Sequence, residues 1–376
     1  MFVLSDGGRP DAARIRERLG QLVAAESPSG HRAGLERCHE LLQEWGTGVF
    51  GRPAEVIVDE GTPHLLWRAA QPGVLLLGHV DTVWPLGTVE QWPFAVDGER
   101  ATGPGVFDMK AGLVQALEAL TLCRDPAAVS LLVTGDEEIG SPTSRALIET
   151  VAADHTAVLV LEPSLDGAVK TARKGGSIYQ VDIIGRAAHA GLEPHRGINA
   201  LIELATQTLT VAGFGDAALG TTVTPTVASA GTTTNTVPAA ARLRVDVRAW
   251  ETAELERVHS SMRTLVATVP GATVTVDGTI NRPPLERACS MDLLRLARQI
   301  AATRGLGEIA EAAVGGASDG NFTAALGIPT LDGLGPLGGG PHARHEWADL
   351  ASLADRALLV AGMLDALAAG GGAPLA

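Results

Sequence analysis

VLLLGHVDT, residues 74–82, is an apolar run that ends on a histidine and a carboxylate. The run predicts a buried strand that stops near His79. Side chains two residues apart on a strand share a face, so we expect His79 and Asp81 to project together from its carboxyl end. Open α/β sheets bind their ligands at that edge. The same pair is also common as a purely structural hydrogen bond, and both interpretations stay open at this point.

Four further stretches place acidic or imidazole side chains beside apolar runs. They read GPGVFDMKAG (103–112), TGDEEIGS (134–141), LEPS (161–164) and GGGPHARHEW (338–347). Parallel strands would bring these side chains to one sheet edge, where several carboxylates repel one another and lose hydration. A divalent cation removes that cost. Oxygen and imidazole ligands without cysteine suit zinc, manganese or cobalt in a hydrolytic site.

These motifs, together with HVDT (79–82), GRAAHAG (185–191) and GGASDGNF (315–322), occur in the order found in the two-zinc aminoacylase and carboxypeptidase family. The chain most resembles the glutamate carboxypeptidase branch of that family, over residues 10–365. Each motif alone is modest support, whereas seven in order are strong support. The resemblance implies a zinc-dependent amidohydrolase with two divalent metal ions per subunit, for which Zn²⁺ is expected and Co²⁺ or Mn²⁺ are alternatives.

The resemblance also implies a set of metal ligands. His79 and Glu162 would bind one ion, Glu138 and His342 would bind the other, and Asp108 would bridge both. Asp108 also stands where a helix N-cap would stand. Glu138 and Glu162 could each be a solvated loop acid, which is the commoner fate of a single glutamate.

Two histidines compete for the last ligand position. The family pattern places the ligand four residues before the glutamate of an acid–aromatic pair, and Glu346-Trp347 is that pair here. This spacing selects His342 and leaves His345 as a surface or supporting residue.

Glu137 is the expected general base, since a carboxylate beside a metal-activated water can take its proton and return it to the leaving amine. Asp81 would orient His79 rather than bind metal. Asp136 is interpreted as a spare loop acid. The resemblance further implies a cis peptide bond between Asp108 and Met109.

Substrate-binding residues are expected in the later motifs. His189 matches a family histidine that reaches the active site of a neighbouring subunit, although on its own it would more simply cap a turn. Asn235 matches a position near the substrate. Arg282 fits the family's carboxylate anchor, because its fork suits bidentate pairing, and the Gly315-Gly316 backbone would help to hold the same carboxylate.

Composition limits the classes of protein. A chain of 376 residues predicts two domains, and a net charge of −14 disfavours nucleic acid or an anionic membrane as a partner. Three scattered cysteines indicate neither a disulfide framework nor a thiolate zinc site. The first residues lack a basic segment followed by a long apolar one, and no apolar stretch has the length of a membrane span, so we expect a cytoplasmic protein. The glycine-rich residues 370–374 predict a disordered tail.

The order of elements predicts an α/β fold. Apolar strands alternate with helices in the first half, which indicates a mostly parallel sheet. A β-α-β-β-α-β order then predicts a ferredoxin-like insertion. We therefore expect a discontinuous zinc-binding catalytic domain (1–174 and 288–376) and an inserted lid or dimerisation domain (175–287). The resemblance implies a homodimer formed through that insertion.

The predicted function is a dizinc metallohydrolase that cleaves an amide bond of a short peptide or N-acyl amino acid and releases a C-terminal amino acid, like a glutamate carboxypeptidase. An N-acyl-amino-acid deacylase of the aminoacylase or desuccinylase type is the alternative. Succinyl-diaminopimelate desuccinylases carry GGTSDGRF, whereas Ala317 and Asn321 replace the threonine and arginine here. A non-catalytic relative that binds a small molecule is less favoured, because all five ligands and Glu137 are present.

Overall fold

The computed structural model describes residues 8–71 and 73–369, so the tail predicted at residues 370–374 lies outside the described residues. The chain divides into two compact units, which are described separately. The first comprises Met1–Ala172, Arg287–Ala313 and Ser318–Ala376, and the second comprises Arg173–Glu286 and Val314–Ala317. The last of these segments, which the sequence analysis assigned to the catalytic domain, groups with the second unit. Its backbone is held there, because Lys174 N donates to Val314 O at 3.1 Å.

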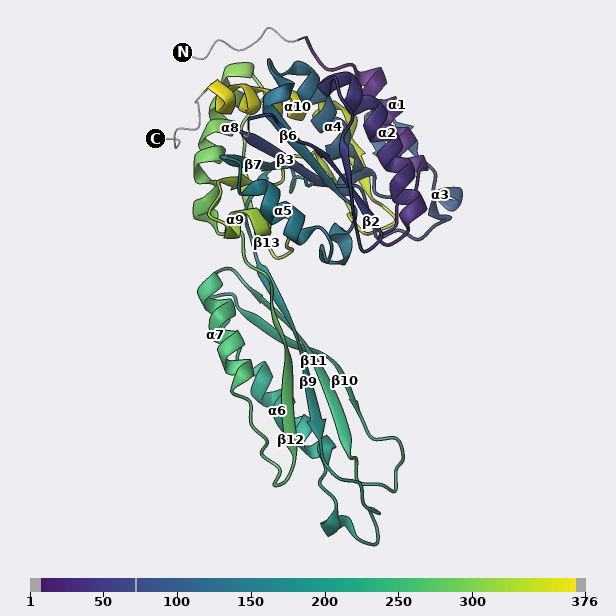
Figure 1. Ribbon diagram of the computed structural model, residues 1–376, viewed down its shortest axis with the longest axis vertical. Coiled ribbons are helices and arrows are strands. Elements are labelled where there is room, and N and C mark those ends of the chain that lie inside the picture. Colours follow the sequence, from purple (N-terminus) through teal and green to yellow (C-terminus); the bar gives the residue numbers. More distant parts are fainter. Residues whose placement is uncertain (1–7, 72, 370–376) are drawn as a thin grey trace. The chain divides into compact units, whose positions relative to one another are not determined.

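A six-stranded sheet forms the centre of the first unit (Figure 1). Its strands, in spatial order, are β1 (Glu55–Asp59), β2 (Thr62–Trp67), β6 (Val129–Thr134), β3 (Val74–His79), β7 (Ala157–Val160) and β14 (Thr330–Leu331). From β6 to β14 neighbouring strands pair in parallel, whereas β1 and β2 are antiparallel. Every residue of β3 and β6 is buried, as expected for parallel strands that are covered on both faces. This parallel-rich sheet confirms the predicted α/β class.

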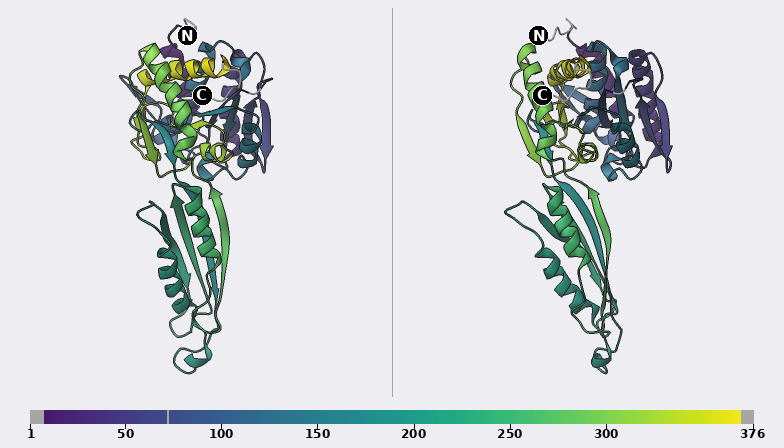
Figure 2. Two further views of the ribbon diagram at one scale, coloured as in Figure 1. Left: turned by 90° about the vertical axis from the view of Figure 1, so that its left-hand side faces the viewer. Right: turned by 60° about the vertical axis from the view of Figure 1, so that its left-hand side comes forward.

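Helices cover both faces of this sheet, as Figures 1 and 2 show. One face packs against the larger hydrophobic core, built with α1 (Ala12–Ala24), α2 (Arg32–Phe50), α4 (Ala111–Leu122), α8 (Met291–Arg304) and α10 (Leu350–Ala369). The other face packs against α5 (Arg145–Ala152) and α9 (Gly320–Ala325). Helix α4 is buried from Ala111 to Leu120, because it lies between the sheet and other helices. Its Gly112 permits this approach, since a Cβ there would lie 2.2 Å from Leu161 O.

A second, small sheet in the first unit was not predicted from the sequence. It contains β15 (Gly338–Gly339), β16 (Trp347–Asp349), β5 (Arg100–Thr102) and β4 (Ala95–Asp97). Strands of two or three residues are too short to show a hydrophobic period. This sheet nevertheless joins the segment before His342 to the segment before Asp108, two regions that are far apart in the chain.

The remaining elements of the first unit are short. They are α3 (Thr88–Gln91), the strand β8 (Val169–Arg173) with its partner β13 (Glu311–Val314), and the single turns η1 (Val106–Lys110), η2 (Pro126–Ala128), η3 (Glu137–Ile139) and η5 (Arg287–Ser290). Two of these turns carry acidic residues that the motifs singled out. Within residues 8–71 and 73–369, no helix combines the length and apolar character needed to cross a membrane.

The second unit has the predicted β-α-β-β-α-β order. Its elements are β9 (Gly175–Ile184), η4 (Pro194–Arg196), α6 (Ala200–Ala212), β10 (Thr222–Ala230), β11 (Ala240–Ala249), α7 (Thr252–Arg263) and β12 (Thr273–Arg282). The strands form an antiparallel sheet in the order β10-β11-β9-β12. Alternate residues of β11 are buried against the helices, from Ala241 to Ala249, and those between them face outward.

Candidate metal centre

Five side chains nominated by the motifs converge at the carboxyl ends of the parallel strands. Each comes from a different segment. They are His79 at the end of β3, Asp108 in η1, Glu138 in η3 after β6, Glu162 after β7 and His342 after β15. The parallel strands β3, β6 and β7 end at one edge of their sheet, which brings His79, Glu138 and Glu162 together. The small antiparallel sheet joins the segments that carry Asp108 and His342.

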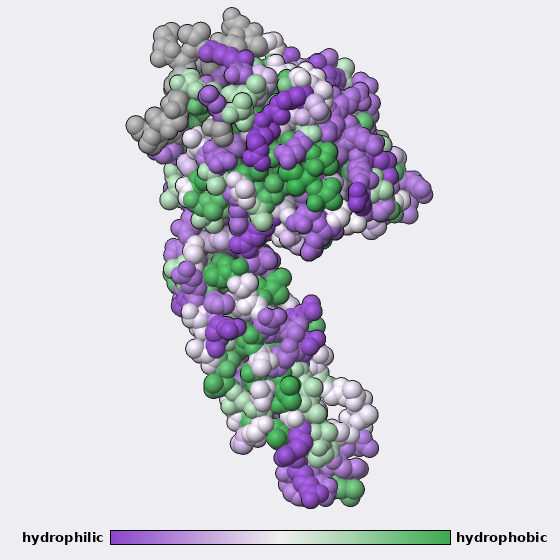
Figure 3. Space-filling model, viewed as in Figure 1, coloured by the Kyte–Doolittle hydropathy of each residue, from purple (hydrophilic) through white to green (hydrophobic). Residues whose placement is uncertain are grey.

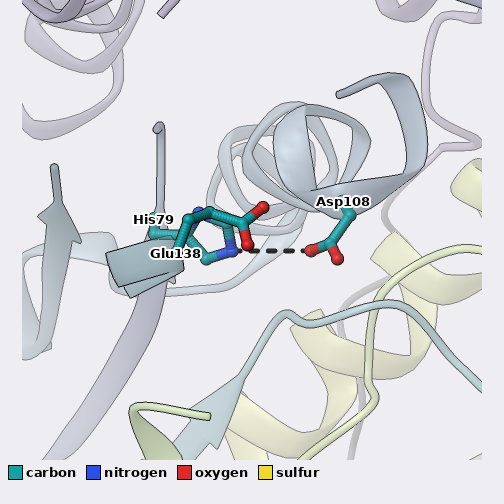
Figure 4. Close-up of side chains that lie close together, drawn as sticks. All are labelled: His79, Asp108 and Glu138. Atoms are coloured by element: carbon teal, nitrogen blue, oxygen red, sulfur yellow. Dashed lines mark ion pairs between the residues drawn. The ribbon is translucent and has the colours of Figure 1, made fainter. Parts of the chain in front are cut away.

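Asp108 divides the five side chains into two sets. His79 Nε2 lies 3.5 Å from Asp108 Oδ1 and 3.4 Å from Glu162 Oε1. His342 Nε2 lies 3.3 Å from Asp108 Oδ2 and 3.0 Å from Glu138 Oε2. Figure 4 shows the Asp108 carboxylate facing the His79 ring, with Glu138 beside them. Each oxygen of Asp108 therefore faces one histidine, which is the arrangement of a bridging carboxylate.

The donor atoms fit two divalent cations. Two ligand atoms at about 2.0–2.1 Å from one tetrahedral zinc ion lie roughly 3.3 Å apart. Within each of the two sets, the donor atoms lie 3.0–3.5 Å apart, which is close to that value. Moreover His79 Nε2, Asp108 Oδ1 and Glu138 Oε1 are buried and form no hydrogen bond with any residue that the structure describes. Buried polar atoms are normally paired, and a divalent cation at this position would give these atoms a partner.

The close packing of carboxylates and imidazoles also shifts the pKa values of these side chains. Burial opposes the charged form of Asp108, but the nearby imidazole groups of His342 and His79 outweigh it and hold the pKa of this carboxyl well below its usual range. Hydrogen bonds to Asp108 and Glu138 raise the pKa of His342 to about 10. Burial lowers the pKa of His79, yet the carboxylates around it raise the pKa well above the ordinary value. A bound cation would displace the protons that these raised pKa values favour on the two histidines.

Asp81 holds both His79 and the loop after β6. Its Oδ1 lies 3.4 Å from His79 Nδ1. The same carboxylate accepts hydrogen bonds from Glu137 N and Glu138 N, both at 3.1 Å, and from Ser29 Oγ at 2.6 Å. His79 Nδ1 also lies 3.0 Å from the backbone oxygen of Asp81, so Asp81 orients the ligand ring through both groups, while its carboxylate fixes the backbone of two neighbouring acids.

Glu137 and Glu138 point to different parts of the centre. A carboxylate oxygen of Glu137 belongs to a group with His79 and Glu162 whose ligand atoms all lie within 4.8 Å of one another, whereas Glu138 faces His342. Adjacent residues can do this because η3 is a helical turn at the strand end. Asp136, interpreted above as a spare loop acid, is instead buried. It accepts hydrogen bonds from the backbone N–H and hydroxyl groups of Thr143 and Ser144, which anchors the turn.

Glu346 is a functional residue whose role the sequence did not reveal, although its acid–aromatic pair was used to count back to His342. Its carboxylate is fully buried and accepts four hydrogen bonds, from Gly105 N (3.1 Å), Phe107 N (2.9 Å), Asp108 N (3.0 Å) and Trp84 Nε1 (3.0 Å). Burial raises the pKa of the Glu346 carboxyl to about 7, against backbone N–H groups that lower it. Glu346 therefore positions the loop that carries Asp108.

The structure of this loop tests two expectations about Asp108, namely that it caps a helix and that a cis peptide bond follows it. Helix α4 has no side-chain cap, so Asp108 is not its N-cap residue. The Asp108–Met109 peptide bond is cis, as the resemblance implied.

We expect Glu346→Gln to weaken both folding and metal binding. The amide NH₂ would face backbone N–H donors that now bind a carboxylate oxygen, and unsatisfied buried donors cost about 1–3 kcal/mol of unfolding free energy. Metal affinity should fall by about 10- to 100-fold, the range for residues that support ligands. Chemical denaturation and metal titration measure the two effects. The exposed Glu90→Gln is the control, and equal behaviour of the two variants would contradict this role.

His342 and His345 differ clearly in the structure. Both histidines are exposed, but among the residues that the structure describes only His342 pairs with Asp108 and Glu138. We expect His342→Ala to lose about one metal ion per chain and His345→Ala to retain both, because only the first removes a ligand atom. Elemental analysis of the purified variants gives the counts. Loss of metal in the His345 variant would identify that histidine as the ligand instead.

The substrate-binding candidates lie in the second unit, where they form two groups. His189 and Asn235 lie in neighbouring segments. Ala190 N donates to Asn235 O at 2.9 Å, and His189 forms an isolated antiparallel β-bridge with Thr236. Arg282, which is 6% exposed, pairs with Gly176 at the start of β9, while His189 follows the last residue of that strand, Ile184. The strand separates the two groups by roughly 26 Å at about 3.3 Å per residue.

His189 does cap a turn. Its Nδ1 accepts hydrogen bonds from Gly191 N at 3.2 Å and Leu192 N at 3.1 Å, and the side chain is exposed. A neutral ring whose Nδ1 accepts must carry its proton on Nε2, which makes Nε2 a donor. The Gly315-Gly316 backbone is exposed, and Arg173 Nη1 donates to Gly316 O at 3.1 Å.

Comparison with known proteins points to the same family as the sequence motifs. The profile of peptidase family M20/M25/M40 matches residues 75–366. The chain is 30% identical to carboxypeptidase G2 of Pseudomonas sp. (strain RS-16) over 98% of its own length and 92% of that protein. It is 31% identical to succinyl-diaminopimelate desuccinylase of Caulobacter vibrioides over 48% of this chain and 51% of that one. The crystal structure of aminopeptidase PepT from Bacillus cereus shares the fold, with a TM-score of 0.75 at 21% identity over 96% of this chain and all of that one.

Proposed function

This chain belongs to peptidase family M20/M25/M40, and from that premise we propose that it is a dizinc amidohydrolase that releases a C-terminal amino acid from a short peptide or N-acyl amino acid. The observation that carries the proposal is Asp108, whose two oxygens face His79 and His342 separately. His79, Asp108 and Glu162 would hold one ion, and His342, Asp108 and Glu138 the other. Ions bound there polarise a substrate carbonyl and lower the pKa of a water molecule.

The protein's own residues would carry the protons. Glu137 shares a donor group with His79 and Glu162 but is not needed for either ligand set, so it remains for general-base catalysis. It would take a proton from the attacking water and return it to the amine that leaves. Asp81 supports this step by fixing the backbone N–H of Glu137 at 3.1 Å.

The free α-carboxylate of the substrate would bind to the second unit. Arg282 offers a guanidinium fork, and Asn235 and the Gly315-Gly316 backbone offer further polar groups. Because β9 separates Arg282 from Asn235 and His189, one small substrate cannot touch both groups of the same chain. We therefore propose a homodimer in which His189 and Asn235 serve the site of the partner subunit.

The surface of the second unit supports association. Exposed apolar side chains lie on its sheet and on α6, among them Ile178 (60%), Val227 (58%) and Leu209 (76%). Figure 3 shows hydrophobic residues in green along this unit, interspersed with hydrophilic ones. Large exposed apolar side chains on a sheet face are available for contact with a second protein.

The second candidate function is an N-acyl-amino-acid deacylase. The half-length similarity to succinyl-diaminopimelate desuccinylase favours it, whereas Ala317 and Asn321 depart from the desuccinylase motif. Both reactions break the amide bond to the nitrogen of the released amino acid. They differ in the acyl or peptidyl group that is attached to that nitrogen.

A substrate panel tests the proposal. The purified enzyme loaded with Zn²⁺, Co²⁺ or Mn²⁺ is assayed with dipeptides, N-benzoyl and N-acetyl amino acids and N-succinyl-diaminopimelate, and the release of free amino acid is measured. Preference for C-terminal glutamate supports the carboxypeptidase proposal, and preference for small acyl groups supports the deacylase. A metal-loaded enzyme that hydrolyses none of these substrates would contradict both and favour a binding protein.

A further inference from the structure

A cavity of about 420 Å³ lies at the start of α10 in the first unit, and no residue of the candidate metal centre lines it. Its walls come from the segment after β7, the segment after α8, Leu337 and the first turns of α10. The volume falls within the roughly 300–1,000 Å³ typical of small-molecule sites.

A buried cation without a counter-ion lines this cavity. Arg356 is only 5% exposed; its Nη2 donates to Gly167 O, while Nη1 is buried and has no hydrogen-bond partner. Within the described part of the chain, no carboxylate forms an ion pair with it. Burial lowers the pKa of the guanidinium to about 10, so it remains charged at neutral pH. A buried, unpaired charge is unfavourable, and an anion at this position would offset that cost.

The rim of the cavity carries the opposite charge. Asp166 and Glu308 are exposed at the edge, and neither forms an ion pair with a residue that the structure describes. The other two acids of the lining are engaged, Asp349 with Ala351 N at 2.9 Å and Asp355 with Arg9 Nη2 at 3.1 Å. A ligand with several negative charges, such as phosphate, would be repelled by this rim.

Apolar side chains complete the lining. They are Leu306, Ile309, Leu337 and Leu359. One deep cation, an acidic rim and aliphatic walls together match a zwitterion with an aliphatic side chain.

We propose that this cavity binds a free aliphatic α-amino acid, with its carboxylate on Arg356, its ammonium group at Asp166 and Glu308, and its side chain against the leucines. This site is separate from the catalytic one and does not depend on the proposed reaction. Two of its walls adjoin the metal centre in the chain, because Asp166 follows Glu162 by four residues and Leu337 precedes His342 by five. The backbones of these two segments are joined, with Ser164 N donating to Pro336 O at 3.1 Å.

Calorimetric titration of the metal-loaded enzyme with L-leucine tests the proposal. Arg356→Met should weaken the binding at least about 10-fold, since hydrogen bonds to a charged group are lost. Arg304→Met is the matched control, because Arg304 also has buried guanidinium nitrogens without partners but does not line the cavity. It should bind leucine as the wild type does. If Arg356→Met fails to fold, Ala351→Trp, which fills the mouth and retains Arg356, should give the same loss.

Two analogues test how the ligand is held. The acid 4-methylpentanoate lacks the ammonium group, and 3-methylbutylamine lacks the carboxylate. Leucine should bind more tightly than either, and Asp166→Asn with Glu308→Gln should weaken leucine while leaving 4-methylpentanoate unchanged. Leucine binding that survives in both Arg356→Met and Ala351→Trp would place the amino acid at the catalytic site and overturn the proposal. Absence of saturable leucine binding to the wild type, or equal affinity for leucine and 4-methylpentanoate, would overturn it as well.

Discussion

Glu137→Gln should lower kcat by about 100- to 10,000-fold, the contribution typical of a general base, while metal content and fold stay intact. Glutamine has nearly the same shape as glutamate, but its amide cannot accept a proton from water. The backbone of residue 137 remains fixed by Asp81, whose Oδ1 accepts from its N–H at 3.1 Å, so the loop should not move.

The neighbouring acid provides the matched control. Glu138→Gln should also lose activity, but it should do so by losing metal, since Glu138 Oε2 lies 3.0 Å from His342 Nε2 and would share an ion with it. Steady-state kinetics and elemental analysis on the two variants separate proton transfer from metal binding. Near-normal turnover of the metal-replete Glu137 variant would remove this residue from the general-base role.

Mixing two inactive variants should restore activity if His189 acts on the partner subunit. His189→Ala removes a donor that would stabilise the developing oxyanion, and Glu137→Gln removes the base. In a heterodimer of the two, one composite site would hold both defects and the other neither. We expect activity of about half the wild-type value per heterodimer, because a symmetric dimer has two equivalent sites and one is intact.

Co-expression with two different affinity tags allows the heterodimer to be isolated and its composition confirmed. The control pair is Glu137→Gln with Glu138→Gln. Both residues lie in the first unit, so exchange of the second unit between subunits cannot produce a site without a defect. That pair should remain inactive, because every first unit carries one defect whichever subunit supplies the second unit. Confirmed His189/Glu137 heterodimers without activity would return His189 to its role as a turn cap.

The geometry within the second unit makes this test informative. His189 and Asn235 lie together at one end of the sheet, and Arg282 lies near the start of β9 at the other end. Motif matching had placed Arg282 and Asn235 around one substrate and His189 in the active site of a neighbouring subunit. It could not show that a strand of ten residues, Gly175–Ile184, stands between them.

The sequence by itself determined the fold class and pointed to the side chains that meet at the candidate metal centre. Fully apolar strands and a change of pattern near residue 175 are local signals, and the parallel sheet and the β-α-β-β-α-β unit follow from them. The resemblance of seven short motifs to a known family nominated His79, Asp108, Glu138, Glu162 and His342, and each of these residues lies at or beside the end of an element.

Only the tertiary structure decided how these side chains are arranged and supported. Glu346 binds the backbone of Asp108 across 238 residues of sequence, and the small sheet that brings these segments together has strands of two or three residues. The separate pairing of the two Asp108 oxygens and the burial of Arg356, whose Nη1 has no hydrogen-bond partner among the described residues, likewise depend on contacts between distant segments. Hydrophobic periodicity reports which face of an element is buried, but it contains no information on which distant polar group that face will meet.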